Sequence, residues 1–210
     1  MNLKTAFLAG AIALPVQQMD NWQILQFSNI EPNRVSFSSE GMAVNVKASA
    51  SPIIYPLEAP LIVSRVEVSG ELSNLLSVEA EKQGQGDNDD FTLKIGLVVA
   101  GDKTLNGLQK LFSAKWIRTL FELAPEGAGV DNIYFLNAVQ DSRQLGLKRQ
   151  HPLSELIFED NVWLLDRAGA FEFDHRLEKP LEVIAVWLSI DGDNTGSSYS
   201  TLIRSLRLES

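Results

Sequence analysis

The sequence predicts an all-β domain: a jelly-roll-like antiparallel β-sandwich with one inserted amphipathic helix. Apolar and polar residues alternate within several segments, most clearly over Phe91–Val99, which places one face of each strand in a core and the other toward water. Runs of this kind recur along the chain between clusters of glycine, asparagine and serine, as all-β folds require. A single segment, residues 105–121, has apolar residues at spacings of three and four instead.

We expect about ten strands after the first 20 residues. The run Leu181–Ile190 is apolar on both of its faces, which predicts a central strand or a strand covered by an additional element. The expected strands are Trp22–Phe27, Arg34–Ser38, Met42–Val46, Ile53–Leu57, Leu61–Ser69, Leu75–Ala80, Phe91–Val99, Ile133–Val139, Leu153–Phe158, Leu181–Ile190 and Ser198–Leu208.

The inserted helix is expected to begin near Thr104 and to end before Pro125, a length of about 18 residues. Its apolar stripe favours packing on a sheet edge or over one end of the sandwich. The alternative is a helix that docks on a membrane surface or on a partner protein.

Composition excludes several classes of protein. The 210 residues include no cysteine, so there is no disulfide framework, thiolate metal site or cysteine nucleophile. With 27 acidic and 18 basic residues the net charge is −9, which opposes binding to the phosphate backbone of nucleic acids. A hydrophobic content of 45% is too high for a disordered chain. No linker divides the chain, and nothing in it indicates an oligomeric state.

The amino-terminal residues 1–20 resemble a signal peptide, followed by one domain over residues 21–210. Lys4 precedes an apolar run, Ala6–Leu14, and Ala11-x-Ala13 offers small residues for cleavage. This pattern predicts an exported bacterial protein, periplasmic or secreted. The alternative is a short buried helix at the start of the domain. No later segment has the length of a transmembrane helix.

Two acidic clusters adjoin expected strands. The segment Asp191–Gly196 begins like a calcium loop, but position twelve is Leu202 where an EF-hand needs glutamate. Asp191 and Asp193 therefore predict either a calcium site of another type or simply a hairpin turn. In the second cluster, Asp89 and Asp90 predict part of the same calcium site, a general acid/base pair or a solvated loop.

These clusters carry a resemblance to a known family. Four segments in this order are similar to the exported bacterial family called domain of unknown function 3047: Asp89–Lys94, Ile133–Phe135, Trp163–Arg167 and Asp191–Gly196. The resemblance runs from about Trp22 to the end of the chain. It implies an exported β-sandwich similar to carbohydrate-binding modules, with no established activity.

The matching polar and aromatic residues are our candidate ligand site. Tyr134 and Trp163 are the candidates for stacking on a sugar ring. The full set is Asp89, Asp90, Lys94, Tyr134, Trp163, Arg167, Asp193 and Asn194. We expect a non-catalytic module that binds a glycan or another extracytoplasmic ligand. The alternatives are a glycan-active hydrolase with paired carboxylates, and an assembly protein that docks through the inserted helix.

Overall fold

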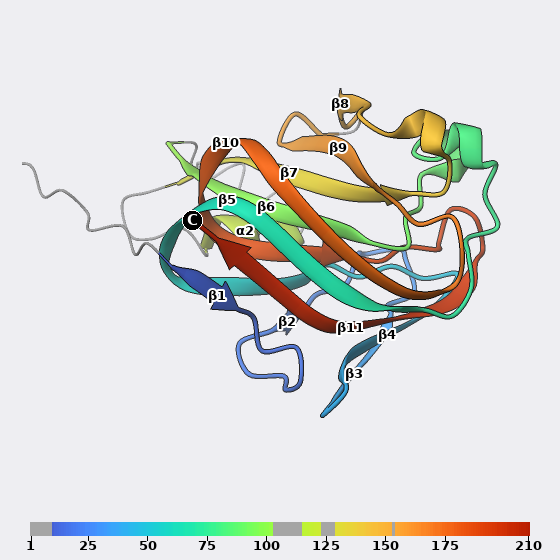
Figure 1. Cartoon of the computed structure of the whole chain (residues 1–210), viewed down its shortest axis with the longest axis horizontal. Coiled ribbons are helices and arrows are strands. Elements are labelled where there is room, and N and C mark those ends of the chain that lie inside the picture. The colour runs from blue at the N-terminus through green and yellow to red at the C-terminus, as the bar shows by residue number, and fades with distance from the viewer. Residues whose placement is uncertain (1–9, 103–114, 123–128, 153) are drawn as a thin grey trace, which may run out of the picture.

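The protein is dominated by one large β-sheet (Figure 1). The computed structural model describes residues 10–102, 115–122, 129–152 and 154–210. The sheet has eleven strands, and its main path runs β3-β4-β11-β5-β10-β6-β7-β9-β8. The strands are β1 (Ala11–Ala13), β2 (Gln23–Ile24), β3 (Arg34–Ser38), β4 (Gly41–Lys47), β5 (Ile53–Leu72), β6 (Lys94–Gly101), β7 (Gly129–Val139), β8 (Lys148–Gln150), β9 (Ile157–Leu164), β10 (Gly169–Ser189) and β11 (Ser198–Glu209).

Two long strands, β5 and β10, let this sheet fold over on itself. Residues 169–176 of β10 pair with residues 65–72 of β5, whereas residues 181–188 pair with residues 53–63. A register shift between Arg176 and Leu181 separates the two halves. The first half of β10 lies in a layer with β11 and β4, and the second half lies in a layer with β6, β7 and β9.

The two layers enclose the main hydrophobic core, which makes the fold a β-sandwich. The same cluster of buried residues contains Val44 from β4, Ile203 from β11 and Leu97 from β6. Because these strands are far apart in the order of the sheet, they meet only if the sheet curves around the cluster. Every strand pair is antiparallel except β7 with β9, which are parallel.

A second apolar cluster covers the outer face of the β10-β6-β7 layer. Ile184 and Trp187 of β10 belong to it, whereas Val186 and Leu188 point into the main core. Both faces of this strand are therefore buried, and the predicted central position of Leu181–Ile190 is confirmed. Residues of the amino-terminal segment, such as Phe27, pack on this outer face.

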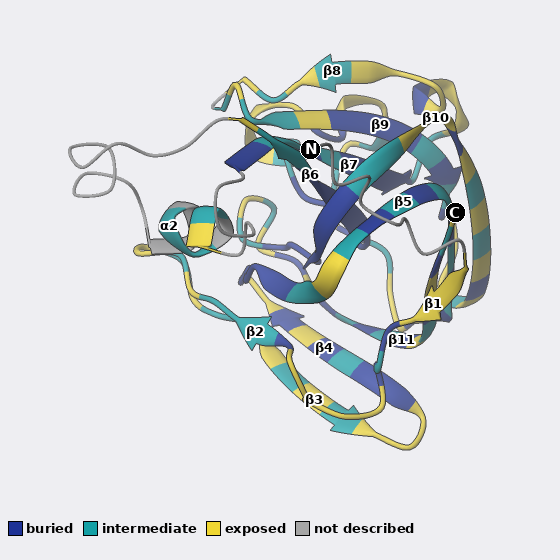
Figure 2. Cartoon of the chain, turned by 90° about the vertical axis from the view of Figure 1, so that its left-hand side faces the viewer, coloured by how far each residue is buried: buried dark blue, intermediate teal, exposed yellow. Residues whose placement is uncertain are grey.

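The predicted inserted amphipathic helix is not seen, and the described residues contain only a short helix within its expected span. Helix α2 covers Lys115–Glu122 and lies at the outer face of the sheet (Figure 2), where Phe121 packs against the second cluster. Most of the expected segment lies outside the described residues, so an 18-residue helix is not seen. The described part of the chain contains three further one-turn 3₁₀ helices: Ala80–Lys82, Gly86–Asn88 and Ser142–Gln144.

Some predicted strands differ from the observed ones. Ile53–Leu57 and Leu61–Ser69 form a single strand, β5, because Pro60 lies at an irregularity in the pairing rather than at a chain reversal. Leu75–Ala80 is not a strand; it forms part of the connection between β5 and β6. The hairpin predicted at Asp191–Gly196 is wrong, because β5 lies between β10 and β11 in the sheet.

The amino-terminal segment packs on the domain from residue 10 onward. Strand β1 pairs with β11, and the Leu14 amide donates a hydrogen bond to the Leu206 carbonyl at 2.9 Å. The side chains of Leu14 and Val16 are buried in the main core. Residues 1–9 lie outside the described part, and the signal peptide stays a prediction. None of the helices in the described ranges is long and apolar enough to cross a bilayer.

Candidate functional site

A cavity of about 340 Å³ opens on the outer face of the β10-β6-β7 layer, and we call it the outer pocket. The sheet supplies its floor. Its walls come from four segments: the segment before β3, the β8–β9 connection, the loop before β6 and the loop after β10. The lining includes Phe27, Asp89, Lys94, Phe135, His151, Trp187, Ser189, Asp191, Asp193 and Asn194.

The floor is built around a glycine. Gly96 of β6 pairs with Phe135 on one side and with Trp187 on the other. A Cβ atom at Gly96 would lie 2.7 Å from the Phe135 ring, so the glycine makes room for the aromatic side chains. The rings of Phe135 and Trp187 pack edge to face, with centroids 5.4 Å apart.

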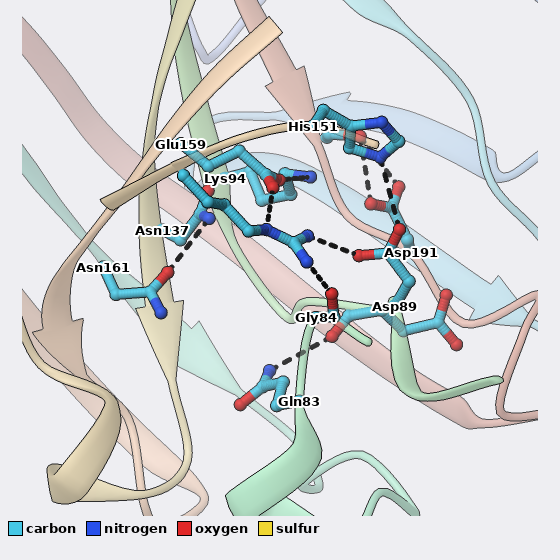
Figure 3. Close-up of polar contacts among 12 residues, drawn as sticks. Gln83, Gly84, Asp89, Lys94, Asn137, His151, Glu159, Asn161 and Asp191 are labelled. Atoms are coloured by element: carbon cyan, nitrogen blue, oxygen red, sulfur yellow. Dashed lines mark hydrogen bonds and ion pairs between the residues drawn. The ribbon is translucent and has the colours of Figure 1, made fainter. Parts of the chain in front are cut away.

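A chain of charged side chains that includes Lys94 and Asp89 of the lining adjoins this floor (Figure 3). Lys94 Nζ is 2.6 Å from Glu159 Oε1, and the other oxygen of Glu159 accepts a hydrogen bond from Arg149 Nε at 2.5 Å. Arg149 also binds Asp89 at 2.9 Å and donates to the Gly84 carbonyl. The side chains of Glu159 and Lys94 are 1% and 9% exposed, so this ion pair is shielded from water, whereas Arg149 is partly exposed.

The ion pairs keep the partners charged. Burial acts to raise the pKa of Glu159, but Lys94 and Arg149 outweigh it and hold the pKa below its ordinary value. For Lys94, burial acts to lower the pKa, yet the carboxylates of Glu159 and Asp191 raise it overall. Glu159 and Lys94 therefore both stay charged near neutral pH and do not exchange a proton there.

Asp89 connects the chain of charges to a histidine. His151 Nε2 lies 3.2 Å from Asp89 Oδ2 (Figure 3). Burial acts to raise the pKa of Asp89, but the contacts with His151, Lys94 and Arg149 lower it overall. Asp89 is therefore an ionised acceptor at the rim of the outer pocket.

Asp191 is the exception among these carboxyl groups. Burial raises its pKa to about 7, and the neighbouring carboxylates of Asp90 and Asp193 add to the shift. Lys94 opposes the shift, as does the Ser189 hydroxyl, which donates to Asp191 Oδ1 at 2.8 Å. Asp191 consequently exchanges a proton near neutral pH, whereas the carboxyl groups paired with Arg149 do not.

Asp90 has a structural position behind the pocket. It is fully buried and accepts hydrogen bonds at 2.7 Å from both the amide and the hydroxyl of Thr195. The Asn194 amide makes a longer contact with it, at 3.4 Å. These bonds hold the loop after β10, which carries Asp193 and Asn194, against the segment before β6.

The structure divides the predicted site into separate groups. Asp89, Lys94, Asp191, Asp193 and Asn194 line the outer pocket together. The other four candidates do not line it: Asp90, Tyr134, Trp163 and Arg167.

Tyr134 and Trp163 lie on the opposite face of their strands. Tyr134 pairs with Leu97, which points into the main core, and its hydroxyl donates to Asp160 Oδ2 at 2.7 Å. Trp163 is 4% exposed and stacks on Phe173 with centroids 5.4 Å apart. Arg167 is exposed in the connection after β9. Because side chains alternate along a strand, Phe135 faces the outer pocket while Tyr134 cannot.

Sequence reasoning missed Arg149, Glu159, His151, Phe135 and Trp187. The segment around Glu159 did contain a signal, because Glu159 and Asn161 lie two residues apart on one face of a strand whose other residues are largely apolar. A polar residue repeated at that spacing indicates a polar patch on a buried face.

The calcium prediction concerns Asp191 and Asp193. Both line the outer pocket, and carboxylate oxygens are ligands that Ca²⁺ prefers. Within the described ranges, however, no group of three or more histidine, aspartate or glutamate side chains is arranged to hold a metal ion.

Comparisons with known proteins give distant structural similarity only. No family model matches the chain, and no curated protein matches it. The solved structures that resemble it include the xylan-binding module CBM15, with 8% identity over 95% of each chain and a TM-score of 0.38. A family 11 carbohydrate-binding module from Clostridium thermocellum, solved with a mixed-linked tetrasaccharide, has 11% identity over 96% of each chain and a TM-score of 0.40.

An enzyme is among the similar structures as well. The apo Crh5 transglycosylase has 10% identity, a TM-score of 0.35, and alignment over 96% of this chain and 85% of its own. Similarity at these TM-scores is distant, so the outer pocket itself has to carry any functional conclusion.

Proposed function

We propose that this protein is a non-catalytic binding module that holds a glycan in the outer pocket. The observation that carries the proposal is the lining: an aromatic floor, Phe135 and Trp187, beneath a polar rim that includes Asp89, Asp193 and Asn194. Sugars present apolar ring faces and hydroxyl groups together, and sites for them combine aromatic contacts with a few directed hydrogen bonds.

The rim is held in place before a ligand arrives. The Asn194 side chain donates to the Asp89 carbonyl at 3.3 Å, and Asp89 is fixed in turn by Arg149 and His151. A rim fixed in this way loses little conformational freedom on binding, which favours affinity. The volume of about 340 Å³ is at the small end of the range for ligand sites.

The export prediction belongs to the same proposal. The apolar run Ala6–Leu14 and the Ala11-x-Ala13 segment support a periplasmic or secreted protein. The segments shared with domain of unknown function 3047 support membership in that exported family. The folded-over sheet supports a jelly-roll-like β-sandwich as its architecture.

A glycan-array screen of the full chain, followed by calorimetry on the best ligand, tests the proposal. Asp193→Asn removes a rim charge and should weaken binding about tenfold, as expected for one hydrogen bond to a charged group. Asp166→Asn is the matched control, because Asp166 is exposed on the connection after β9 and lies outside the pocket. If no glycan binds, or if the two variants bind equally, the proposal is wrong.

One observation favours a second candidate, a glycan-active hydrolase. A glycosidase needs a protonated carboxyl group beside an ionised one, and Asp191, with its pKa raised to about 7, shares the outer pocket with the ionised Asp89. Release of reducing ends from a bound glycan, abolished by Asp191→Asn, would establish this candidate in place of the first. Binding without any release would exclude it.

A further inference from the structure

The floor of the outer pocket is narrow. It spans three adjacent strands, β10, β6 and β7, where Trp187, Gly96 and Phe135 lie side by side in the pairing. Neighbouring strands are about 4.8 Å apart, so the floor is roughly 10 Å wide across the strands. A saccharide that continued beyond this width would have to leave the floor over β5 on one side or over β9 on the other.

Both of these sides carry other segments of the chain. Strand β2 pairs with β5, and Phe27 and Ile30, which follow β2, line the outer pocket from that side. Strand β9 pairs with β7, and His151 and Ser154 of the β8–β9 connection line the pocket from the other side. A glycan chain laid across the strands would therefore have to displace one of these two walls.

The two ends of the floor, along the strands, are occupied as well. Antiparallel pairing puts Lys94 beside Ser189, so the start of β6 and the end of β10 lie at the same end of the floor. The loops that carry Asp89 and Asn194 line the pocket there. Toward the opposite end, helix α2 contacts β7, and its Phe121 packs against the second apolar cluster. A chain laid along the strands would meet an obstacle in both directions.

Hydrogen bonds join neighbouring walls to one another. The Asn194 side chain donates to the Asp89 carbonyl at 3.3 Å, and His151 Nε2 lies 3.2 Å from the Asp89 carboxylate. The segment before β3 is bonded to the end of β10, because the Asn33 side chain, which is 6% exposed, donates to the Ile190 carbonyl at 2.8 Å. Widening the pocket into a groove would break such bonds, and a buried group that loses its partner costs free energy.

We infer that the outer pocket holds the terminal unit of a glycan chain and does not hold an internal stretch of a chain. The inference rests on the proposed glycan-binding function and names the form of its ligand. A pocket bounded on both sides and at both ends accepts a saccharide only through its mouth, with the rest of the chain directed into solvent. The volume of about 340 Å³, at the small end of the range for ligand sites, agrees with a short bound segment.

Calorimetry on the full chain with saccharides of increasing length tests the inference. The probes are xylose, glucose and N-acetylglucosamine as monomers and as β-1,4-linked dimers, tetramers and hexamers. In a series that binds, we expect the affinity to increase up to the dimer and then to change less than threefold up to the hexamer. A larger increase between dimer and hexamer would show an open cleft and would overturn the inference, while the glycan-binding function would stand. If neither these probes nor the glycan array gives binding, both are wrong.

Two matched variants give a second readout. Asn194→Ala removes a side-chain amide from the rim and should weaken the dimer, the tetramer and the hexamer by the same factor, about fivefold, as expected for one neutral hydrogen bond. The factor is the same because each of them is bound through the same terminal unit. Asn74→Ala is the control, because Asn74 is exposed in the connection after β5 and does not line the pocket, and it should leave all affinities unchanged.

Circular dichroism on both variants checks that each is folded. A loss of affinity in Asn194→Ala that grows with the length of the saccharide would contradict the inference, since further units of the chain would then contact the rim. No loss at any length would place the bound saccharide outside the outer pocket, and the inference would be wrong while glycan binding by the protein would stand.

Discussion

Replacing Asp191 with asparagine should change how the stability of the protein depends on pH. The folded protein raises the pKa of Asp191 to about 7, whereas the ordinary value, 3.8, applies to the unfolded chain. Between these values the folded state keeps a proton that the unfolded state has released. For a carboxyl group with a raised pKa, the free energy of unfolding therefore falls as the pH rises through this window and stays low above it.

The size of the effect follows from the shift. At pH 5 the solution is about two pH units below the folded pKa, and each unit corresponds to roughly 1.4 kcal/mol. The wild-type protein should lose up to about 3 kcal/mol of stability at this position between pH 5 and pH 8. Asparagine has no proton to exchange, so Asp191→Asn should gain about that amount relative to the wild type over the same range.

Urea unfolding followed by tryptophan fluorescence measures the difference, because Trp22, Trp163 and Trp187 are all buried. Burial lowers the pKa of His175, which gives a pH dependence of opposite sign, but His175 is present in both proteins and its contribution cancels. Equal pH dependence in the wild type and in Asp191→Asn would refute the reasoning, since Asp191 would then be ionised throughout. Asp166→Asn, an exposed substitution of the same kind, should follow the wild type.

Three further changes test other parts of the structure. Glu159→Gln leaves Lys94 buried without its counter-charge and should cost about 3 kcal/mol in urea unfolding; a cost below about 1 kcal/mol would contradict a buried ion pair. Asp90→Ala removes the carboxylate that accepts hydrogen bonds from Thr195 in the loop after β10. The substitution should lower the free energy of unfolding by about 2 kcal/mol and speed amide hydrogen exchange in that loop. Unchanged exchange would show that Asp90 does not hold the loop in place. Deleting residues 1–20 removes two buried core side chains, Leu14 and Val16, and should cost about 3 kcal/mol; a melting temperature equal to that of the full chain would show that the segment from residue 10 adds no stability.

The strands could be predicted from the sequence because their signal is local. Alternation over Phe91–Val99 and apolar character on both faces of Leu181–Ile190 each reflect the surroundings of a single strand. The folding of one sheet into two layers could not be predicted in the same way. It depends on register shifts within β5 and β10, which are determined by contacts between residues about 100 positions apart.

The candidate site follows the same division. The aspartates of the outer pocket form two clusters in the sequence, so they could be found without a structure. Arg149, which binds Asp89, and Glu159, which binds Arg149, come from β8 and β9 at the far end of the sheet order, and no short motif joins them to Asp89. Tyr134 was wrongly predicted for a different reason, because its neighbour in the chain, Phe135, is the residue that faces the outer pocket. Both faces of β7 carry apolar residues, so the sequence does not show which face lies toward the pocket.

The pairing of β5 has a consequence for how the chain acquires its structure. Residues 53–72 find their two neighbours in residues 169–188 and 201–209, so this strand has no partner on either side along most of its length until nearly all of the chain has been synthesised. Pairing over such separations is slow to form. Pairing of β5 should therefore follow the synthesis of most of the chain rather than accompany it. A chain that stops before residue 169 should be unable to build the part of the sheet that contains β5.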